Sequence, residues 1–338
     1  NRVGLDVTYY KASAQNQILP VDISSATGFS SMVINAGEIT NEGVEAMLNV
    51  SPIDIKNGLR WDITFNFARN KSKVVSLAEG IETHELSRDR WGTIEARPGN
   101  DFGNIVGWYW KRNEDGEKLL DGNGRYQRDG NEVKVLGNIQ PDWLAGINNQ
   151  ISYKGFTLSA LIDIKMGGEL LSGTKYIQAA RGTGRFTTEG IYQNEDGLWV
   201  GIADGVMEED YYVDDGNGNQ VLELAAGERS TIELPRHFLA GQYTRQDIIE
   251  EFVLDASYVS LREITFQYSF PKSVLSKLPF TGAQIAIVGR NLAYLVEHMQ
   301  GLGISPEAAF STQSGAQGSE SYTSPSTRSI GFNIKLDF

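Results

Sequence analysis

Few residues of this chain have the chemistry that catalysis requires. Its only three histidines, His84, His237 and His298, lie far apart in the sequence, and cysteine is absent. Catalytic triads and zinc sites need histidine or cysteine with close partners, and no H-E-x-x-H, G-x-S-x-G or phosphate-loop pattern occurs. We therefore expect a protein that is not an enzyme and that needs no cofactor.

Ligand recognition is a better candidate, in the segment 173–199, GTKYIQAARGTGRFTTEGIYQNEDGLW. Sugar recognition uses flat aromatic faces with convergent hydrogen-bond donors, and peptide recognition would combine the same aromatics with arginines that bind carboxylates. Packing of the loop, or contact with a partner, explains these residue types equally well. The candidate substrate-binding residues are Tyr176, Arg181, Arg185, Tyr192 and Trp199.

Acidic, glycine-rich stretches raise the possibility of calcium. In LLDGNGRYQ and DDGNGNQ the spacing that a calcium loop needs fails, because Arg125, Gln220 and Ala226 occupy positions that need other residue types. We interpret both as glycine turns at loop tips. Between Asp204 and Glu233 there are nine acidic residues and one basic residue. This stretch is either a solvated outer surface or a contact that a cation such as calcium bridges.

Overall charge and hydropathy narrow the class of protein. The 338 residues carry a net charge of −13, which argues against nucleic-acid binding. Mean hydropathy is −0.30. No run approaches the roughly 18 apolar residues of a membrane-spanning helix. A transmembrane β-barrel remains compatible with these values, because its strands alternate lipid-facing with lumen-facing residues.

Alternation with period 2 is the dominant pattern of the chain. In LRWDITFNFARN, for example, the apolar positions from Leu59 to Phe67 alternate with polar ones. Each run has about the ten residues that a tilted strand needs to cross a bilayer, and ordinary globular strands average about half of that. Nine predicted strands cover residues 2–11, 43–51, 59–70, 103–112, 144–153, 155–164, 256–270, 282–292 and 328–338.

The connections between these strands alternate between short and long. Residues 51–58 and 154–155 are short, whereas five connections are long and rich in Gly, Asn, Asp and Ser. Outer-membrane barrels have this asymmetry, with short periplasmic turns and long external loops. When the strands are counted back from the C-terminus, the connections 51–58 and 71–102 fall on the wrong sides of the membrane for their lengths. We therefore expect a further strand within 71–142, near EKLLDGNGRYQ. A helix is expected only at 245–256, with a short turn at 271–278.

Aromatic residues favour the membrane over a soluble alternative. A soluble β-sandwich or β-solenoid would turn the apolar strand faces into a core. Membrane barrels instead place aromatic girdles at both interfaces, near the strand ends. Candidates for such girdles are Tyr9, Tyr10, Trp108, Tyr109, Trp110, Trp143, Tyr153, Phe156, Tyr268, Phe270, Tyr294 and Phe338. Strand length, loop asymmetry and aromatic placement together predict a transmembrane antiparallel β-barrel of the all-β class.

Several segments resemble SusC/RagA-type TonB-dependent outer-membrane transporters. One pattern of this family, G-N-x-x-P…Y-K-G-F, is similar to GNIQPDWLAGINNQISYKGF (137–156). A second family pattern resembles DASYVSLREITFQYSFP (255–271). VGRNLAYL (288–295), the hairpin 41–77 and the closing strand 321–338 are also similar, with spacing differences in the last. The five segments follow the order of the family along nearly the whole chain.

The resemblance implies a fold and a domain organisation. Residues 1–338 would be the C-terminal portion of a 22-stranded barrel whose plug domain, TonB box and N-terminal strands lie outside this chain. The chain also begins within an alternating element, NRVGLDVTYY, as expected for part of a larger protein. The last strand would pair with the first to close the barrel, and its apolar residues would act as the signal for barrel insertion: Ile334, Leu336 and Phe338.

The resemblance also implies a function in the outer membrane of a Gram-negative cell. The protein would import oligosaccharides or peptides actively, as the SusC-like channel of a SusCD-type complex. Its partners would be a SusD-like surface lipoprotein, TonB through the region outside this chain, and outer-membrane lipid. The alternative is a barrel that does not transport, such as an adhesin or assembly component. Polar residues of the strands, among them Arg60, Asp62, Asn66, Asp163, Asn333, Lys335 and Asp337, would line the channel.

Overall fold

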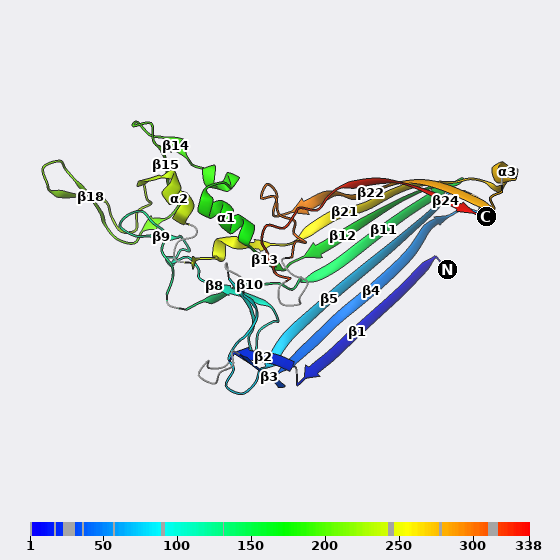
Figure 1. Cartoon of the computed structure of the whole chain (residues 1–338), viewed down its shortest axis with the longest axis horizontal. Coiled ribbons are helices and arrows are strands. Elements are labelled where there is room, and N and C mark those ends of the chain that lie inside the picture. The colour runs from blue at the N-terminus through cyan, green and yellow to red at the C-terminus, as the bar shows by residue number, and fades with distance from the viewer. Residues whose placement is uncertain are drawn as a thin grey trace.

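A computed structural model of the chain describes residues 2–16, 18–22, 31–35, 37–56, 58–88, 92–130, 132–242, 247–276, 279–309 and 317–338. Its main feature is an eight-stranded sheet, here called the wall sheet, in which all neighbouring strands are antiparallel (Figure 1). In spatial order its strands are β1 (Val3–Gln15), β4 (Glu38–Asp54), β5 (Arg60–Ser76), β11 (Trp143–Tyr153), β12 (Phe156–Met166), β21 (Tyr258–Ser269), β22 (Gly282–Glu297) and β24 (Ser329–Asp337).

The strand register places most apolar residues of the eight strands on one face, with exceptions such as Met47 and Leu144 on the other. One row across the sheet runs through Trp61, Ile151, Leu158, Phe266, Ile287 and Phe332, which pair in that order. The intervening positions form a polar face. Because side chains alternate between faces, a slip of one residue in any pair would mix the two. The register is therefore set by the alternation itself.

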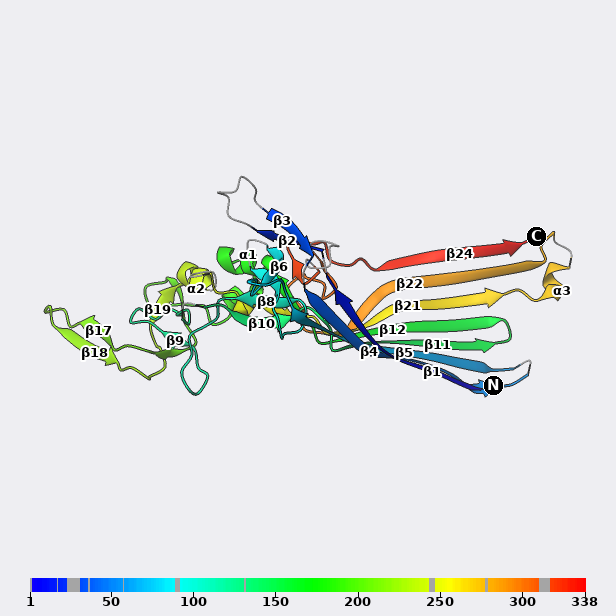
Figure 2. The same ribbon diagram turned by 90° about the horizontal axis from the view of Figure 1, so that it is seen from below.

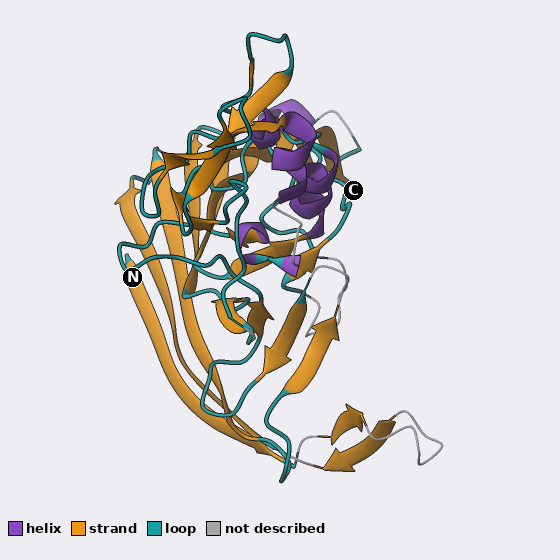
Figure 3. Ribbon diagram, turned by 90° about the vertical axis from the view of Figure 1, so that its left-hand side faces the viewer, coloured by secondary structure: helices purple, strands orange, loops and turns teal. Residues whose placement is uncertain are grey.

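The apolar face is not covered by other parts of the described chain. Ile287, Ile330 and Phe332 keep 53%, 77% and 65% of their surface accessible. A soluble sandwich would bury such side chains against a second sheet, so that alternative is wrong. The strands also follow an arc when the molecule is seen end-on (Figure 3). Strands β1 and β24 form the two edges of the sheet.

Tight turns fix the register at one end of the wall sheet. Strands β11 and β12 are joined by two residues, Lys154 and Gly155, with Tyr153 paired to Phe156. Both turn residues have positive φ, 46° and 88°, as a type I′ hairpin turn requires. A side chain at Gly155 would also meet the Ser269 carbonyl at 2.8 Å. The expected short connection at 154–155 is thus confirmed.

One of the nine predicted strands is not part of the wall sheet. Within 103–112 only β8 (Asn104–Gly107) forms. It lies in a separate four-stranded sheet ordered β10 (Lys134–Asn138), β8, β7 (Thr93–Ala96), β6 (His84–Arg88). All four residues of β8 are buried, so its apolar character comes from a packed core and not from alternation between two faces. The expected additional strand near EKLLDGNGRYQ is also wrong, since only the two-residue β9 (Leu119–Leu120) forms there.

Removing 103–112 from the wall resolves the strand count. The connections after β4, β11 and β21 then all lie at one end of the sheet, near both chain termini. Those after β1, β5, β12 and β22 lie at the other end (Figures 1 and 2). Residues 77–142 form one long connection, where the sequence indicated two. The expected asymmetry of short and long connections is confirmed.

The long connections build a second structure at the far end, here called the loop lobe. Its strands are β2 (Ile18–Asp22), β3 (Ser31–Asn35), β6 (His84–Arg88), β7 (Thr93–Ala96), β8, β9, β10 (Lys134–Asn138), β13 (Glu169–Ser172), β14 (Tyr192–Gln193), β15 (Trp199–Ile202), β16 (Val206–Met207), β17 (Tyr211–Asp214), β18 (Gln220–Leu224), β19 (Glu233–Pro235), β20 (Val253–Asp255) and β23 (Ser319–Glu320). Its helices are α1 (Gly173–Arg181), η2 (Arg185–Thr188), α2 (Arg236–Gln242) and η4 (Glu250–Phe252). At the other end, α3 (Lys272–Leu275) precedes β22.

The loop lobe has an apolar core of its own. Trp110, Leu120, Met207 and Ile248 form one buried cluster. A second contains Ile94, Ile105, Leu171, Ile249 and Phe252. Trp110 is thus buried in the lobe and is not part of an interfacial girdle. At the turn end of the wall, by contrast, aromatic side chains do gather, with Phe156 at 4.5 Å from Tyr268 and Phe280 at 5.1 Å from Phe338 between ring centroids.

The helix expected at 245–256 is wrong within its described residues, and residues 245–246 lie outside them. Only η4 forms there, followed by β20. Ile248 and Ile249 are adjacent, yet they are buried in different clusters, which an extended backbone permits and a helix would hinder. The turn expected at 271–278 is present as α3, within the described residues.

Candidate functional site

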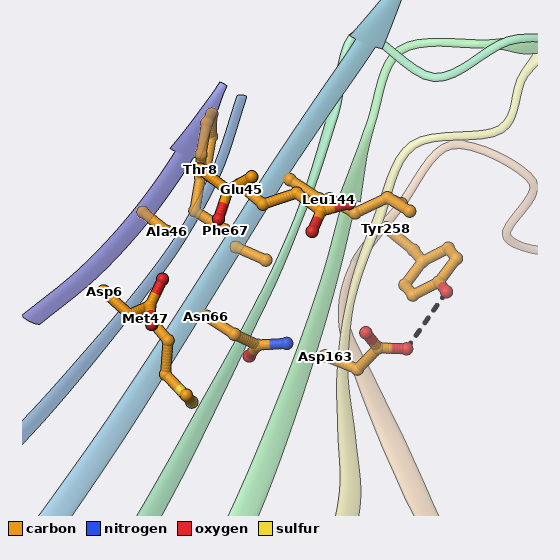
Figure 4. A pocket seen from close by; sticks show the side chains of 12 residues that line it. Asp6, Thr8, Glu45, Ala46, Met47, Asn66, Phe67, Leu144, Asp163 and Tyr258 are labelled. Carbon is orange, nitrogen blue, oxygen red and sulfur yellow. Dashed lines mark hydrogen bonds between the residues drawn. The ribbon is translucent and has the colours of Figure 1, made fainter. Parts of the chain in front are cut away.

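The polar face of the wall sheet lines a hollow of about 680 Å³ (Figure 4). Residues of six neighbouring strands line it, among them Asp6, Glu45, Asn66, Asp163 and Tyr258. Asn66 and Asp163 were expected on the channel side. The register places the other expected residues on this face as well: Arg60, Asp62, Asn333, Lys335 and Asp337.

Arg262 connects the wall to the last long loop. Its Nη2 donates to Asp163 Oδ2 at 2.8 Å, and its Nη1 donates to Glu307 Oε2 at 2.6 Å. Tyr258 Oη lies 3.1 Å from Asp163 and 3.2 Å from Glu307, and Tyr294 Oη donates to Glu307 at 2.8 Å. We call these five residues the latch. It fastens the loop after β22 to the polar face.

Electrostatics favour the ionised form of Glu307. Burial of its carboxyl opposes ionisation, but hydrogen bonds from Arg262 and Tyr294 outweigh burial, so the pKa of Glu307 lies below its ordinary value. The charged latch is therefore the stable state at neutral pH.

The five candidate substrate-binding residues lie in the loop lobe but do not converge on one site. Tyr176 packs edge-on against Phe252, with ring centroids 4.9 Å apart, beside the second apolar cluster. Tyr192 is exposed and donates to Glu233 at 2.7 Å, a hydrogen bond that raises the pKa of its phenol. Arg185 is exposed in η2. Arg181 and Trp199 alone line a common hollow.

That hollow, of about 420 Å³, combines cationic and aromatic side chains. We call it the basic hollow. It is lined by Ala180, Arg181, Gly182, Trp199, Arg236, His237 and Ala240. The sequence analysis missed Arg236 and His237, which come from α2, far along the chain from Arg181. The only local signal was the dipeptide Arg-His, which does not reveal its neighbours.

Helix α1 positions Arg181 through well-defined ends. Ser172 caps its N-terminus by accepting from the Lys175 backbone N–H at 3.0 Å. The buried Glu320 carboxylate lies at the same end and accepts from Thr174 Oγ1 at 2.8 Å, as the helix dipole favours. Gly182 ends the helix with φ of 62°, a left-handed conformation suited to glycine.

A hydrogen bond from Lys175 attaches α1 to the rest of the lobe, beside an ion pair of the same neighbour. Lys175 Nζ donates to the Glu251 carbonyl at 2.7 Å, and Lys118 Nζ lies 3.1 Å from the Glu251 carboxylate. Burial of Glu251 opposes its ionisation, but the ammonium groups of Lys118 and Lys175 outweigh this and hold its pKa below the ordinary value. Burial lowers the pKa of Lys175. These contacts keep the end of α1 at a fixed position.

The glycine-rich segments form turns, as expected. Asp121 Oδ1 accepts from the backbone N–H groups of Asn123 and Arg125 at 2.9 and 3.0 Å. Asp215 accepts from those of Asn217 and Asn219, at the tip of the β17–β18 hairpin. Within the described residues no group of three or more His, Cys, Asp or Glu side chains could hold a metal ion. A cation bridge through 204–233 stays a prediction.

The predicted insertion residues lie at the end of the apolar face. Ile334 and Leu336 pair with Ile285 and Ala283 of β22, and Phe338 follows β24 with 82% of its surface accessible. Their orientation is that of a membrane-facing strand. Their role in insertion stays a prediction. No described helix is long and apolar enough to cross a membrane.

Comparison with known proteins adds sequence and structural relatives. No protein-family model matches the chain. TonB-dependent receptors P3 and P26 of Formosa agariphila are each 24% identical to it, over 99% and 98% of the chain and 32% and 33% of their own lengths. The RagAB peptide transporter structure matches with a TM-score of 0.67 at 16% identity, over the whole chain and 34% of its own chain.

The same importer in its open-open state matches with a TM-score of 0.64. The chain thus spans about a third of the length of the curated relatives it matches. The fold is that of an outer-membrane transporter barrel, and its apolar face is the one that meets lipid. Sequence relatives and fold agree on the location of the strands in the outer membrane.

Proposed function

We propose that this chain, whose curated relatives are named TonB-dependent receptors, forms part of an active importer of oligosaccharides or peptides. The observation that carries the proposal is the segregation of the wall sheet into two faces. Its apolar face suits lipid, and its polar face lines a hollow with carboxylate, amide and phenol groups.

The loop lobe supports a role in capturing solutes. It forms on the side of the wall that carries the long connections, and it has its own buried core, so it presents fixed surfaces. The latch ties one long loop to the polar face. Solutes that reach the barrel from outside would meet the lobe first and the polar face next.

We further propose two protein partners. One is a surface lipoprotein of the SusD type, which would contact the loop lobe from outside. The support is the fold that the chain shares with the RagAB peptide transporter. The other is TonB, which would supply energy through a region that these residues do not include. The names of the curated relatives support this second partner.

Uptake by living cells tests import. Deletion of the gene in its native host should abolish accumulation of at least one labelled oligosaccharide or peptide, and a plasmid copy should restore it. A protonophore should stop uptake by the wild type, because TonB-linked import needs energy. Uptake that persists unchanged in the deletion strain for every probe would contradict the proposal, and loss of cell adhesion alone would favour an adhesin.

Co-purification tests the lipoprotein partner. Extraction of the native protein in mild detergent should recover a lipoprotein in equimolar amount. Repeated recovery of the receptor alone under gentle conditions, with uptake intact, would contradict this part of the proposal and leave import itself standing.

A further inference from the structure

The basic hollow has an unusual charge for this protein. It brings two guanidinium groups, Arg181 and Arg236, and the imidazole of His237 to the rim of one indole, Trp199. The whole chain has a net charge of −13. A cationic site on an acidic protein concentrates positive potential where an anion could be held.

The two arginines of the hollow have no acidic partner within the described residues. Arg236 Nη2 donates to the Gly182 carbonyl at 3.1 Å, which leaves most of its donors for other acceptors. Arg112, Arg229 and Arg262, in contrast, each form ion pairs with carboxylates. The charge of the hollow is therefore not neutralised by the protein itself.

A third cation lies next to the hollow. The Arg125 guanidinium is 5.3 Å from the centre of the Phe238 ring, and Phe238 in turn lies 4.6 Å from the His237 ring. The Arg125 Nε is buried and has no hydrogen-bond partner in the described structure. This arrangement adds positive potential behind His237.

Trp199 supplies a flat surface beside the charges. It begins β15, whose next residue Val200 pairs with Pro235 of β19, and Arg236 follows Pro235 as the first residue of α2. The indole keeps 57% of its surface accessible. The small residues Ala180, Gly182 and Ala240 complete the lining.

From this arrangement we infer that the basic hollow binds an acidic sugar unit, carrying a carboxylate or sulfate, of an oligosaccharide. Guanidinium, imidazole and indole groups offer donors, which match the oxygen-rich surface and negative charge of such a sugar. The indole offers a face for the ring. A peptide would also bring backbone N–H donors, and the lining contains no carboxylate to accept from them, so an acidic sugar matches the lining better. The inference rests on the proposed import function and names its substrate class.

Binding to the purified full-length receptor in detergent tests the inference. The probes are oligogalacturonate, sulfated carrageenan oligosaccharide, neutral maltohexaose and an acidic hexapeptide, measured by calorimetry. The double variant Arg181→Gln/Arg236→Gln should weaken binding of at least one acidic oligosaccharide by about 10-fold or more. Arg181→Lys/Arg236→Lys should retain part of the affinity, because charge remains while the planar fork is lost.

A matched control removes the same charge elsewhere. Arg88 and Arg229 are exposed and lie outside the hollow, so Arg88→Gln/Arg229→Gln should leave the affinity within about twofold. Trp199→Ala should weaken the same acidic probe without altering the fold, as followed by circular dichroism.

Three results would overturn the inference. They are equal affinity of the wild type for maltohexaose and the acidic oligosaccharides, unchanged binding by the Arg181→Gln/Arg236→Gln variant, and arginine-dependent binding of the hexapeptide alone. Each of these leaves the import proposal intact. Import itself fails if the deletion strain accumulates every probe like the wild type, even where the purified receptor binds them.

Discussion

At the scale of single residues, Arg262 is the most informative side chain. It lies in a strand of the wall, yet it is bound by carboxylates from the neighbouring strand and from a loop 45 residues later. A partly buried charge must be paired, and removing one partner costs more than removing both. The latch therefore couples the position of the loop after β22 to the wall.

Glu307→Gln should release this loop. The variant removes the charge that holds Arg262 Nη1 and leaves Asp163 as its only carboxylate partner. Amide hydrogen exchange of residues 298–309 should become roughly 5- to 10-fold faster, a modest effect because the pair is partly exposed. Glu223→Gln, an exposed residue of β18, should leave exchange there unchanged. Unchanged exchange in both variants would exclude the latch as a restraint.

The same loop should respond to acid. Because the pKa of Glu307 is lower in the folded protein than in the unfolded chain, its contribution to stability is complete above the unfolded pKa. It is lost as the pH falls through the depressed folded pKa. The protection of residues 298–309, which is their exchange rate relative to an unstructured peptide at the same pH, should therefore fall below about pH 4.5, the region of an unperturbed glutamate. In Glu307→Gln this loss of protection should be absent.

At the scale of elements, the strands of the wall are amphipathic ribbons with two different solvents. Strand β24 shows this most simply, since Ile330, Phe332 and Ile334 alternate with Ser329, Gly331 and Asn333. Its apolar residues continue the rows of β22, and its polar residues continue the other face. Neighbouring residues of one strand should therefore respond differently to the same charge.

Phe332→Arg should hinder assembly far more than Asn333→Arg. An arginine on the lipid face costs about 1–4 kcal/mol, depending on its depth in the bilayer, whereas one on the polar face stays hydrated. Heat-modifiable gel migration of the full-length receptor from outer-membrane fractions measures the folded amount. Equal yields of the two variants would mean that the faces are assigned wrongly.

At the scale of the whole molecule, the wall sheet and the loop lobe are stabilised by different interactions. The wall holds its position through lipid on one side and a polar hollow on the other. The lobe holds its position through apolar clusters and ion pairs that do not involve lipid. The last residues of the chain lie at the opposite end from the lobe (Figure 1).

Replacing apolar side chains at the C-terminus with smaller or polar ones should impair insertion into the membrane without altering the loop lobe. Phe338→Ala, and more strongly Leu336→Ser/Phe338→Ala, should reduce the amount of folded receptor in the outer membrane several-fold, again by gel migration. Tyr322→Ala removes an aromatic that is 64% exposed in a loop and should have no such effect. Normal assembly of both Phe338 variants would remove the terminus from the insertion signal.

The local sequence predicted strands correctly where the two faces of a strand meet different environments, one apolar and one polar. Eight of the predicted strands are in the wall, because alternation at period 2 is written in neighbouring residues such as Trp61 to Phe67. The segment 103–112 misled, because its apolar residues are buried on all sides in the lobe. Helix α1 was missed because nine residues carry too little periodicity, although its caps, Ser172 and Gly182, adjoin it in the sequence. Only the contact of its N-terminus with Glu320 depends on a residue far along the chain.

The sequence by itself determined the antiparallel wall and which face of it is apolar, because both follow from the alternation of adjacent side chains. Only the tertiary structure decided the latch and the basic hollow. Arg262 meets Asp163 across 99 residues, and Arg181 meets Arg236 through two helices that pack against each other. Such contacts depend on the tertiary folding of the long connections, which no short-range sequence pattern specifies.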